Sequence, residues 1–129
     1  MPATIHQEIV ISASAQRIYD ALLTSDQFSA FTGGRKAQID RTPGGAFSCF
    51  DGMIAGRIVE LIEGRRIVQA WRVGNWPDGI YSVARFELEP QGSGTRITFD
   101  QAGYPAEARE HLEAGWHKMY WEPLRAYLT

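Results

Sequence analysis

A histidine and a carboxylate near the C-terminus have a spacing that could bind a metal ion or move a proton. Glu113 and His117 are four residues apart, so on a helix their side chains would share one face. His111 would lie about 240° around the same helix from His117 and could not join them. A metal site needs three or four converging ligands, and the sequence offers no others. We therefore interpret Glu113 and His117 as a surface ion pair, and predict neither a metal ion nor a cofactor.

The candidates for nucleophilic and acid–base chemistry are isolated. Cys49 lies between Phe47 and Phe50 without a recognisable base or cationic neighbour, so we interpret it as a small buried hydrophobe. Glu60 and Glu87 fall in different predicted strands, and their spacing does not decide whether the two carboxylates converge. His6, in the first predicted strand, is expected to be exposed. No set of catalytic residues is predicted.

Aromatic residues are concentrated in two parts of the chain. Six of them fall on neighbouring predicted strands and on the last predicted helix: Trp71, Trp76, Tyr81, Trp116, Tyr120 and Trp121. They could simply fill the core. A long helix over a concave sheet can instead leave an apolar gap beneath its middle, which is the usual form of a small-molecule pocket. We predict such a pocket, with the lining residues Phe31, Trp71, Phe86, Trp116, Met119 and Tyr120.

The elements that would position these residues follow from periodicity and turn signals. Residues 4–12 alternate in polarity and predict a strand, and Ser14 is placed to cap a helix behind it. A second short helix is predicted from Ser25 to the glycines at 33 and 34. Glycine-containing turns then separate six predicted strands, at residues 36–40, 46–50, 54–62, 66–73, 80–89 and 95–101. Their short connections indicate antiparallel neighbours.

The last predicted helix, residues 107–128, is apolar on two sides. One stripe contains Leu112, Trp116, Met119, Tyr120, Pro123 and Tyr127. The nearly opposite side holds His117 and an outer stripe, Trp121, Leu124 and Leu128, which we expect to contact a partner protein or a second copy of the chain. Pro123 predicts a kink. The fold class is therefore α+β, in the order strand, two helices, six strands and helix, with a curved antiparallel sheet around the C-terminal helix.

Length and charge limit the classes of function. The 129 residues predict a single domain, residues 1–129. Thirteen lysines and arginines against fifteen aspartates and glutamates give a net charge of −2, which argues against nucleic acid as a partner. No apolar run approaches the ~20 residues of a membrane span, and the N-terminal residues lack the pattern of a signal peptide. A single cysteine favours a reducing compartment, so a cytoplasmic location is predicted.

Short motifs in a fixed order run through the sequence: Phe31-Thr32-Gly33, Gly44-Gly45-Ala46-Phe47, Phe50-Asp51-Gly52, Gly56, Ile67-Val68-Gln69-Ala70-Trp71-Arg72, Trp76-Pro77-Asp78-Gly79, Gly94-Thr95, Tyr104-Pro105, and Gly115-Trp116 with Tyr120. In this order they resemble the C-terminal domain of the activator of the ninety-kilodalton heat-shock chaperone's ATPase. That domain belongs to the helix-grip (SRPBCC) superfamily, which includes START lipid carriers and polyketide cyclases. The resemblance implies a helix-grip fold and an apolar ligand bound between the sheet and the C-terminal helix. Within these 129 residues we expect no counterpart of the separate N-terminal domain of the eukaryotic activator.

Three functions are weighed on these grounds. The leading hypothesis is non-enzymatic binding of a lipophilic small molecule in the predicted pocket. The alternative is a protein-interaction domain that modulates a heat-shock chaperone ATPase. Its contact surface would be the outer stripe together with residues 76–79, which we expect to be exposed. An enzyme of the cyclase or hydratase type is least favoured, because no converging acid–base set is recognisable.

Overall fold

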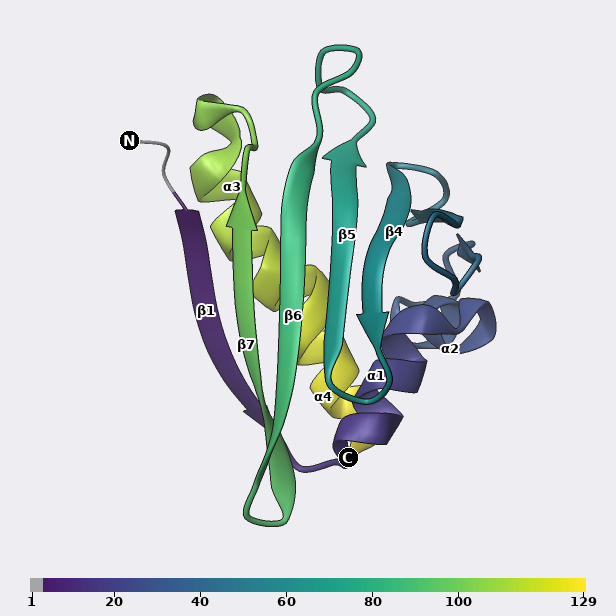
Figure 1. Ribbon diagram of the computed structural model, residues 1–129, viewed down its shortest axis with the longest axis vertical. Coiled ribbons are helices and arrows are strands. Elements are labelled where there is room, and N and C mark those ends of the chain that lie inside the picture. Colours follow the sequence, from purple (N-terminus) through teal and green to yellow (C-terminus); the bar gives the residue numbers. More distant parts are fainter. Residues whose placement is uncertain (1–3) are drawn as a thin grey trace.

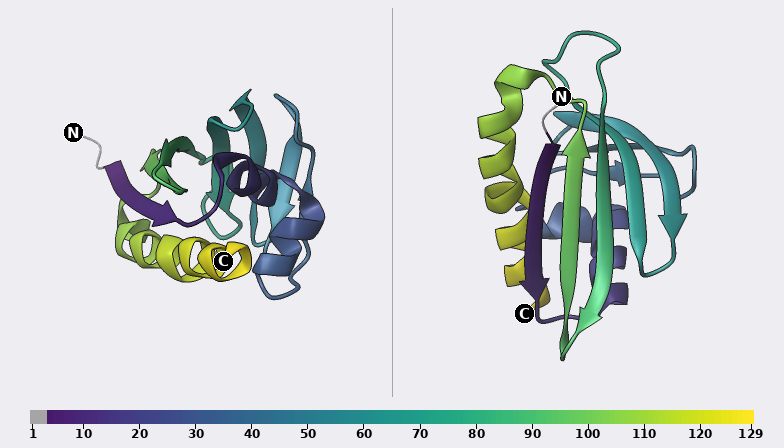
Figure 2. Two further views of the ribbon diagram at one scale, coloured as in Figure 1. Left: turned by 90° about the horizontal axis from the view of Figure 1, so that it is seen from below. Right: turned by 60° about the vertical axis from the view of Figure 1, so that its left-hand side comes forward.

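One antiparallel sheet of seven strands curves around the C-terminal helix (Figure 1, Figure 2). The computed structural model describes residues 4–129. The strands are β1 (Thr4–Ile11), β2 (Gln38–Ile39), β3 (Ala46–Cys49), β4 (Ile54–Ile62), β5 (Arg66–Val73), β6 (Ser82–Gln91) and β7 (Gly94–Ala102). Their order in the sheet is β1-β7-β6-β5-β4-β3-β2, so β1 and β2 are the edges. The six strands β2 to β7 follow one another as sheet neighbours, and β7 also pairs with β1. The predicted α+β fold class is confirmed.

All helices lie on the concave side of the sheet (Figure 2). They are α1 (Ala15–Leu23), α2 (Ser25–Phe31) and a C-terminal helix built from a 3₁₀ turn η1 (Ala106–Ala108), α3 (Arg109–Gly115), a π-helical turn η2 (Trp116–Trp121) and α4 (Glu122–Leu128). The hydroxyl of Ser14 accepts a hydrogen bond from the backbone N–H of Arg17, so the predicted cap of α1 is confirmed. Within residues 4–129, no helix is both long enough and apolar enough to cross a bilayer.

The π-helical turn changes which side chains of the C-terminal helix face the sheet. The backbone N–H of Glu122 donates to the carbonyl of His117, five residues earlier, where an α-helix would use the residue four earlier. The extra residue rotates everything after it by about 100° relative to a regular helix. Trp116 and Trp121 therefore face the same way, and their rings stack 5.8 Å apart at 24°. The turn ends two residues before Pro123, which has no N–H to donate and for which the sequence predicts a kink.

The predicted outer stripe is wrong for this reason. Trp121, Leu124 and Leu128 are 1%, 0% and 5% exposed, so they belong to the core and cannot be a contact surface for a partner or a second copy. Tyr127, assigned to the inner stripe by regular α-helical periodicity, is 40% exposed. The extra residue of the π-helical turn rotates the residues that follow it, so the stripes expected from regular α-helical periodicity do not describe the end of the helix.

Aromatic rings fill the layer between the sheet and the C-terminal helix. They come from β5, β6, β7 and η2: Trp71, Phe86, Phe99, Trp116, Tyr120 and Trp121. The centroid of the Trp116 ring lies 4.2 Å from that of Phe99 and 4.3 Å from that of Tyr120. It lies 5.1 Å from that of Trp71. Such distances are those of directly packed rings, so no solvent layer separates helix and sheet.

Two buried glutamines fix the helix to the sheet. The side-chain carbonyl of Gln101 on β7 accepts a hydrogen bond from Trp116 Nε1 at 2.8 Å. The side-chain carbonyl of Gln7 on β1 accepts one from Trp121 Nε1 at 2.7 Å, and its amide group donates to the backbone carbonyl of Glu113 at 3.0 Å. Both indole N–H groups are thereby satisfied in an otherwise apolar interior.

Candidate functional site

The space under the C-terminal helix is nearly filled. In the part of the chain that the structure describes, a cavity of about 10 Å³ lies where α1, α2 and Tyr120 of η2 face the sheet, and it has room for about one water molecule. Its lining residues are Leu22, Phe28, Ile39, Phe47, Cys49, Gln69, Phe86 and Tyr120. A pocket for a drug-sized apolar ligand measures ~300–1,000 Å³. A fatty acid or sterol would therefore fit only after the helix and sheet had moved apart.

The six residues predicted to line a ligand pocket are brought together only in part. Phe86 and Tyr120 border the small cavity. Phe31, Trp71 and Trp116 are buried in the surrounding core. Met119 is half-buried and packs against the edge of that core. Their role in holding a ligand stays a prediction, and no ligand is needed to complete their packing.

The polar groups at the cavity are in their neutral forms. Tyr120 Oη accepts a hydrogen bond from Trp71 Nε1 at 3.3 Å and lies 3.9 Å from Cys49 Sγ. Burial raises the pKa of the Cys49 thiol to about 12, and burial also raises the pKa of Tyr120 well above its ordinary value. A thiol with that pKa is not a nucleophile at neutral pH. The interpretation of Cys49 as a small buried hydrophobe is confirmed.

The carboxylates singled out in the sequence serve as ion-pair partners. Glu60 and Glu87 do converge, but on Arg66, whose guanidinium contacts them at 3.1 Å and 2.7 Å on the convex face of the sheet. Glu113 forms an ion pair with Arg109 at 3.3 Å, four residues earlier in the helix. The ion pair between Glu113 and His117 that the spacing suggested is therefore not formed. Within residues 4–129, no group of three or more histidine, cysteine, aspartate or glutamate side chains could hold a metal ion.

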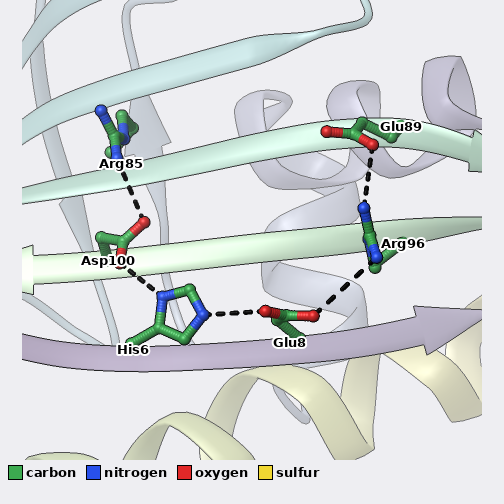
Figure 3. Close-up of polar contacts among 6 residues, drawn as sticks. All are labelled: His6, Glu8, Arg85, Glu89, Arg96 and Asp100. Carbon is green, nitrogen blue, oxygen red and sulfur yellow. Dashed lines mark hydrogen bonds and ion pairs between the residues drawn. The ribbon is translucent and has the colours of Figure 1, made fainter.

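A chain of alternating charges crosses the convex face of β6, β7 and β1 (Figure 3). His6 Nδ1 lies 2.7 Å from Asp100 Oδ1, and His6 Nε2 lies 2.9 Å from Glu8 Oε2. Arg85 contacts the other oxygen of Asp100 at 3.2 Å. Arg96 extends the chain from Glu8 to a further carboxylate on β6. The sequence correctly predicts an exposed His6, but the contact with Asp100 requires the β1–β7 register, which pairs these two residues.

This arrangement favours the protonated form of the His6 ring. Only the imidazolium form can donate through both ring nitrogens, and both nitrogens face carboxylates. Hydrogen bonds to Asp100 and then to Glu8 accordingly raise the pKa of His6 above its ordinary 6.5. Because the folded pKa is the higher one, the stabilisation is fully present below pH 6.5 and is lost as the pH rises through the folded pKa.

We expect an NMR titration of the His6 ring to give a pKa above 6.5. We also expect His6→Gln to destabilise the protein more at pH 6 than at pH 8, as measured by urea unfolding. Asp100→Asn, which removes the larger cause of the shift, should lower the pKa of His6. A His6 pKa at or below 6.5 in the wild-type protein would contradict the double contact.

The β3–β4 turn and the β5–β6 loop both lie at the upper end of the sheet in Figure 1, and four exposed apolar residues belong to these connections or to the first residues of β6. We call Met53, Ile80, Tyr81 and Val83 the loop-end patch; each is at least 40% exposed. The backbone N–H of Gly74 donates to the carbonyl of Met53 at 2.8 Å and joins the two connections. Large exposed apolar groups close together are typical of interaction sites.

The β5–β6 loop beside this patch is held in place. Trp76, expected to be exposed, is buried, and its ring packs against Trp71 with centroids 5.8 Å apart. Pro77, Asp78 and Gly79 are exposed as predicted. The Arg72 guanidinium donates to the carbonyl of Trp76 at 2.6 Å and lies 5.6 Å from the centre of the Tyr81 ring. A loop fixed in this way presents a defined surface.

The sequence is similar to activators of a heat-shock chaperone ATPase. A family model described as "Activator of Hsp90 ATPase homolog 1-like protein" matches residues 12–129. The activator of 90 kDa heat shock protein ATPase homolog 2 of Mus musculus is 27% identical over 124 residues, which cover 96% of this chain and 37% of that protein. The chain spans about a third of the length of this and other curated relatives.

Solved structures share the fold over nearly the whole chain. A crystal structure of an HSP90 activator from Plasmodium falciparum has a TM-score of 0.92 at 20% identity and covers 97% of this chain and 95% of its own. The solution structure of the Aha1 dimer from Colwellia psychrerythraea has a TM-score of 0.83 at 21% identity, with 98% and 96% covered. At these identities the similarity establishes the fold alone. Because the family model covers all but the first eleven residues, the chain belongs to the family of activator of Hsp90 ATPase homolog 1-like proteins.

Proposed function

We propose that the chain is a protein-interaction module that binds a heat-shock chaperone of the ninety-kilodalton class and modulates its ATPase. Membership of the family supports this proposal, since named relatives are activators of that ATPase. The filled interior supports it too, because a cavity of about 10 Å³ leaves the surface as the place where a larger partner can bind. This was the alternative function from the sequence, and the packed core is the single observation that favours it over a small-molecule carrier.

The loop-end patch is the proposed contact surface. With the outer stripe buried, it replaces the surface that helical periodicity suggested. Tyr81 and Met53 are residue types that contribute large contact areas to interfaces, and Arg72 lies against the Tyr81 ring. The neighbouring loop is fixed by its own hydrogen bonds, so little conformational entropy would be lost on docking.

A binding and ATPase assay with the chaperone from the same organism tests this proposal. We expect Tyr81→Ala to weaken binding about tenfold or more, as loss of a central interface aromatic does, and to reduce the effect on ATP turnover in parallel. Tyr127→Ala is the matched control, because Tyr127 is also exposed but lies on α4, away from the patch. Unchanged turnover with the wild-type protein at saturating concentration would exclude the function. Sedimentation at two concentrations decides whether the patch pairs with a second copy instead.

Binding of a lipophilic small molecule is the second candidate. The aromatic lining favours it, as does the short edge strand β2, which contributes Ile39 to the cavity wall and forms only two residue pairs with β3. It requires an expanded state in which Trp116 and Tyr120 move away from Trp71. Fatty acids, sterols and flavonoids can be titrated while tryptophan fluorescence and melting temperature are followed. A ligand at a hundred times its dissociation constant should stabilise the protein by about 2.7 kcal/mol. If no compound changes the fluorescence or the melting temperature, this candidate is excluded.

A further inference from the structure

Three glutamines are buried among the described residues, and one of them differs from the other two. Gln7 and Gln101 each hold an indole N–H of the C-terminal helix and make a second hydrogen bond, to the backbone of Glu113 and to Ser82 Oγ respectively. Gln69 is equally enclosed, at 7% exposure. Its side-chain amide makes no hydrogen bond to any residue between 4 and 129. The fully shielded side-chain atoms without a partner are Arg96 Nε and Tyr104 Oη among residues 4–129, so the Gln69 amide differs from them in keeping some accessible surface, which faces the small cavity that Gln69 lines.

The surroundings of Gln69 explain why no protein group reaches it. Gln69 lies on β5, where its cross-strand neighbours on the concave face are Ile58 of β4 and Ala84 of β6. Both are fully buried apolar side chains. Along β5 itself the next inward residues are Ile67 and Trp71. The hydrogen-bonding side chain among these four neighbours is Trp71, and its indole N–H donates to Tyr120 instead of to Gln69.

The small cavity lies at the end of this side chain. Gln69 lines it together with Tyr120 and Cys49, which are the other polar side chains on its wall. Tyr120 Oη already accepts a hydrogen bond from Trp71, and for its own proton it has only the thiol of Cys49 at 3.9 Å, a weak acceptor. The cavity thus brings together an unused amide and an underused hydroxyl. Its volume of about 10 Å³ is close to the minimum that one water molecule requires.

We propose that this cavity is a binding site for one water molecule, held between the Gln69 amide and the Tyr120 hydroxyl. The water donates to the side-chain carbonyl of Gln69 and accepts from its amide or from Tyr120, which gives it the two or more polar partners that buried waters have. It provides hydrogen-bond partners for the Gln69 amide, which makes none with the residues from 4 to 129. Gln69 is thereby a water-binding residue in a position where a leucine would otherwise pack.

A route for this water is visible in the structure. An open groove of about 420 Å³ runs along the outside of β2 and β3 and begins beside Ser25 at the start of α2. Ile39 and Phe47 line both the groove and the inner cavity, so their side chains form the wall between the two. Ile39 belongs to the two-residue edge strand, whose movement needs few hydrogen bonds to break. Exchange of the water with solvent should therefore pass Ile39.

Water NMR on the full chain tests the site. We expect cross-relaxation peaks from water to the Gln69 side-chain amide protons. Magnetic relaxation dispersion of the water signal, which counts long-lived waters, should find one fewer in Gln69→Leu than in wild type. Gln38→Leu is the matched control, because Gln38 lines the groove but not the cavity and is exposed. Ile39→Ala should retain the water and shorten its residence time.

Two outcomes would overturn the proposal. One is the absence of any long-lived water signal at the Gln69 amide in the wild-type protein. The other is an equal count of long-lived waters in wild type and in a folded Gln69→Leu variant, which would place the water elsewhere. Because the first measurement uses the wild-type protein alone, the proposal is decided even if the Gln69→Leu variant does not fold.

Discussion

Replacement of Trp121 by alanine is expected to lower the free energy of unfolding by about 3–5 kcal/mol, the range for truncating a large core aromatic. The indole is 1% exposed, stacks on Trp116 and lies 5.5 Å from the Phe99 ring between centroids. The variant also removes the hydrogen bond from Trp121 Nε1 to Gln7, which leaves a buried side-chain carbonyl without one of its partners. Urea unfolding followed by circular dichroism measures the loss.

The same experiment tests the π-helical turn, because a regular helix predicts a different result. Without the extra residue, Trp121 would share the outer face of the helix with His117, and its truncation would cost little. His117→Ala is the matched control; His117 is exposed, so we expect a change within about 0.5 kcal/mol. If the two variants lost similar, small amounts of stability, Trp121 would lie on the surface and the π-helical turn would be absent.

Much of the fold follows from local signals, which explains why the sequence predicts it. The bounds of β4 and β5 agree with the predicted strands 54–62 and 66–73, because tight turns flank both strands and apolar residues recur along them. Ser14 caps α1 as predicted, because capping needs only the residues of the first turn. The predicted strand 80–89 begins two residues later, at Ser82, because Ile80 and Tyr81 still belong to the loop and form no residue pair with β5 or β7.

The candidate site depends on information that local patterns do not carry. Periodicity assigns faces on the assumption of 3.6 residues per turn, and one π-helical turn is enough to misplace Trp121 and Tyr127. The aromatic content is the same whether Trp116 covers a hollow or fills it. The two cases differ only in the distance between the helix and the sheet, which composition does not determine. The contacts of Gln7 and Gln101 with the helix join residues far apart in the sequence, so they could not be read from spacing.

Gly56→Ala is expected to destabilise the protein by at least about 3 kcal/mol, at the high end of the effects of single substitutions. Gly56 lies in β4, opposite Phe47 of β3 and Trp71 of β5. A Cβ atom there would clash with the backbone carbonyl oxygen of Ala70 and would stand 2.9 Å from Phe47 Cε1. The first contact is with the backbone of β5, so only a separation of β4 from β5 can relieve it. At this point the two strands pack against the aromatic core.

Gly115→Ala is the matched control for this substitution. Gly115 ends α3 with helical dihedral angles, and a Cβ atom at that position meets nothing within 4 Å. Alanine there should stabilise the protein by about 0.5–1 kcal/mol, because it restricts the unfolded chain and favours the helix. Thermal and urea unfolding of the two variants should therefore change in opposite directions. A Gly56→Ala protein as stable as wild type would mean that β4 and β5 are farther apart at this point than the structure places them.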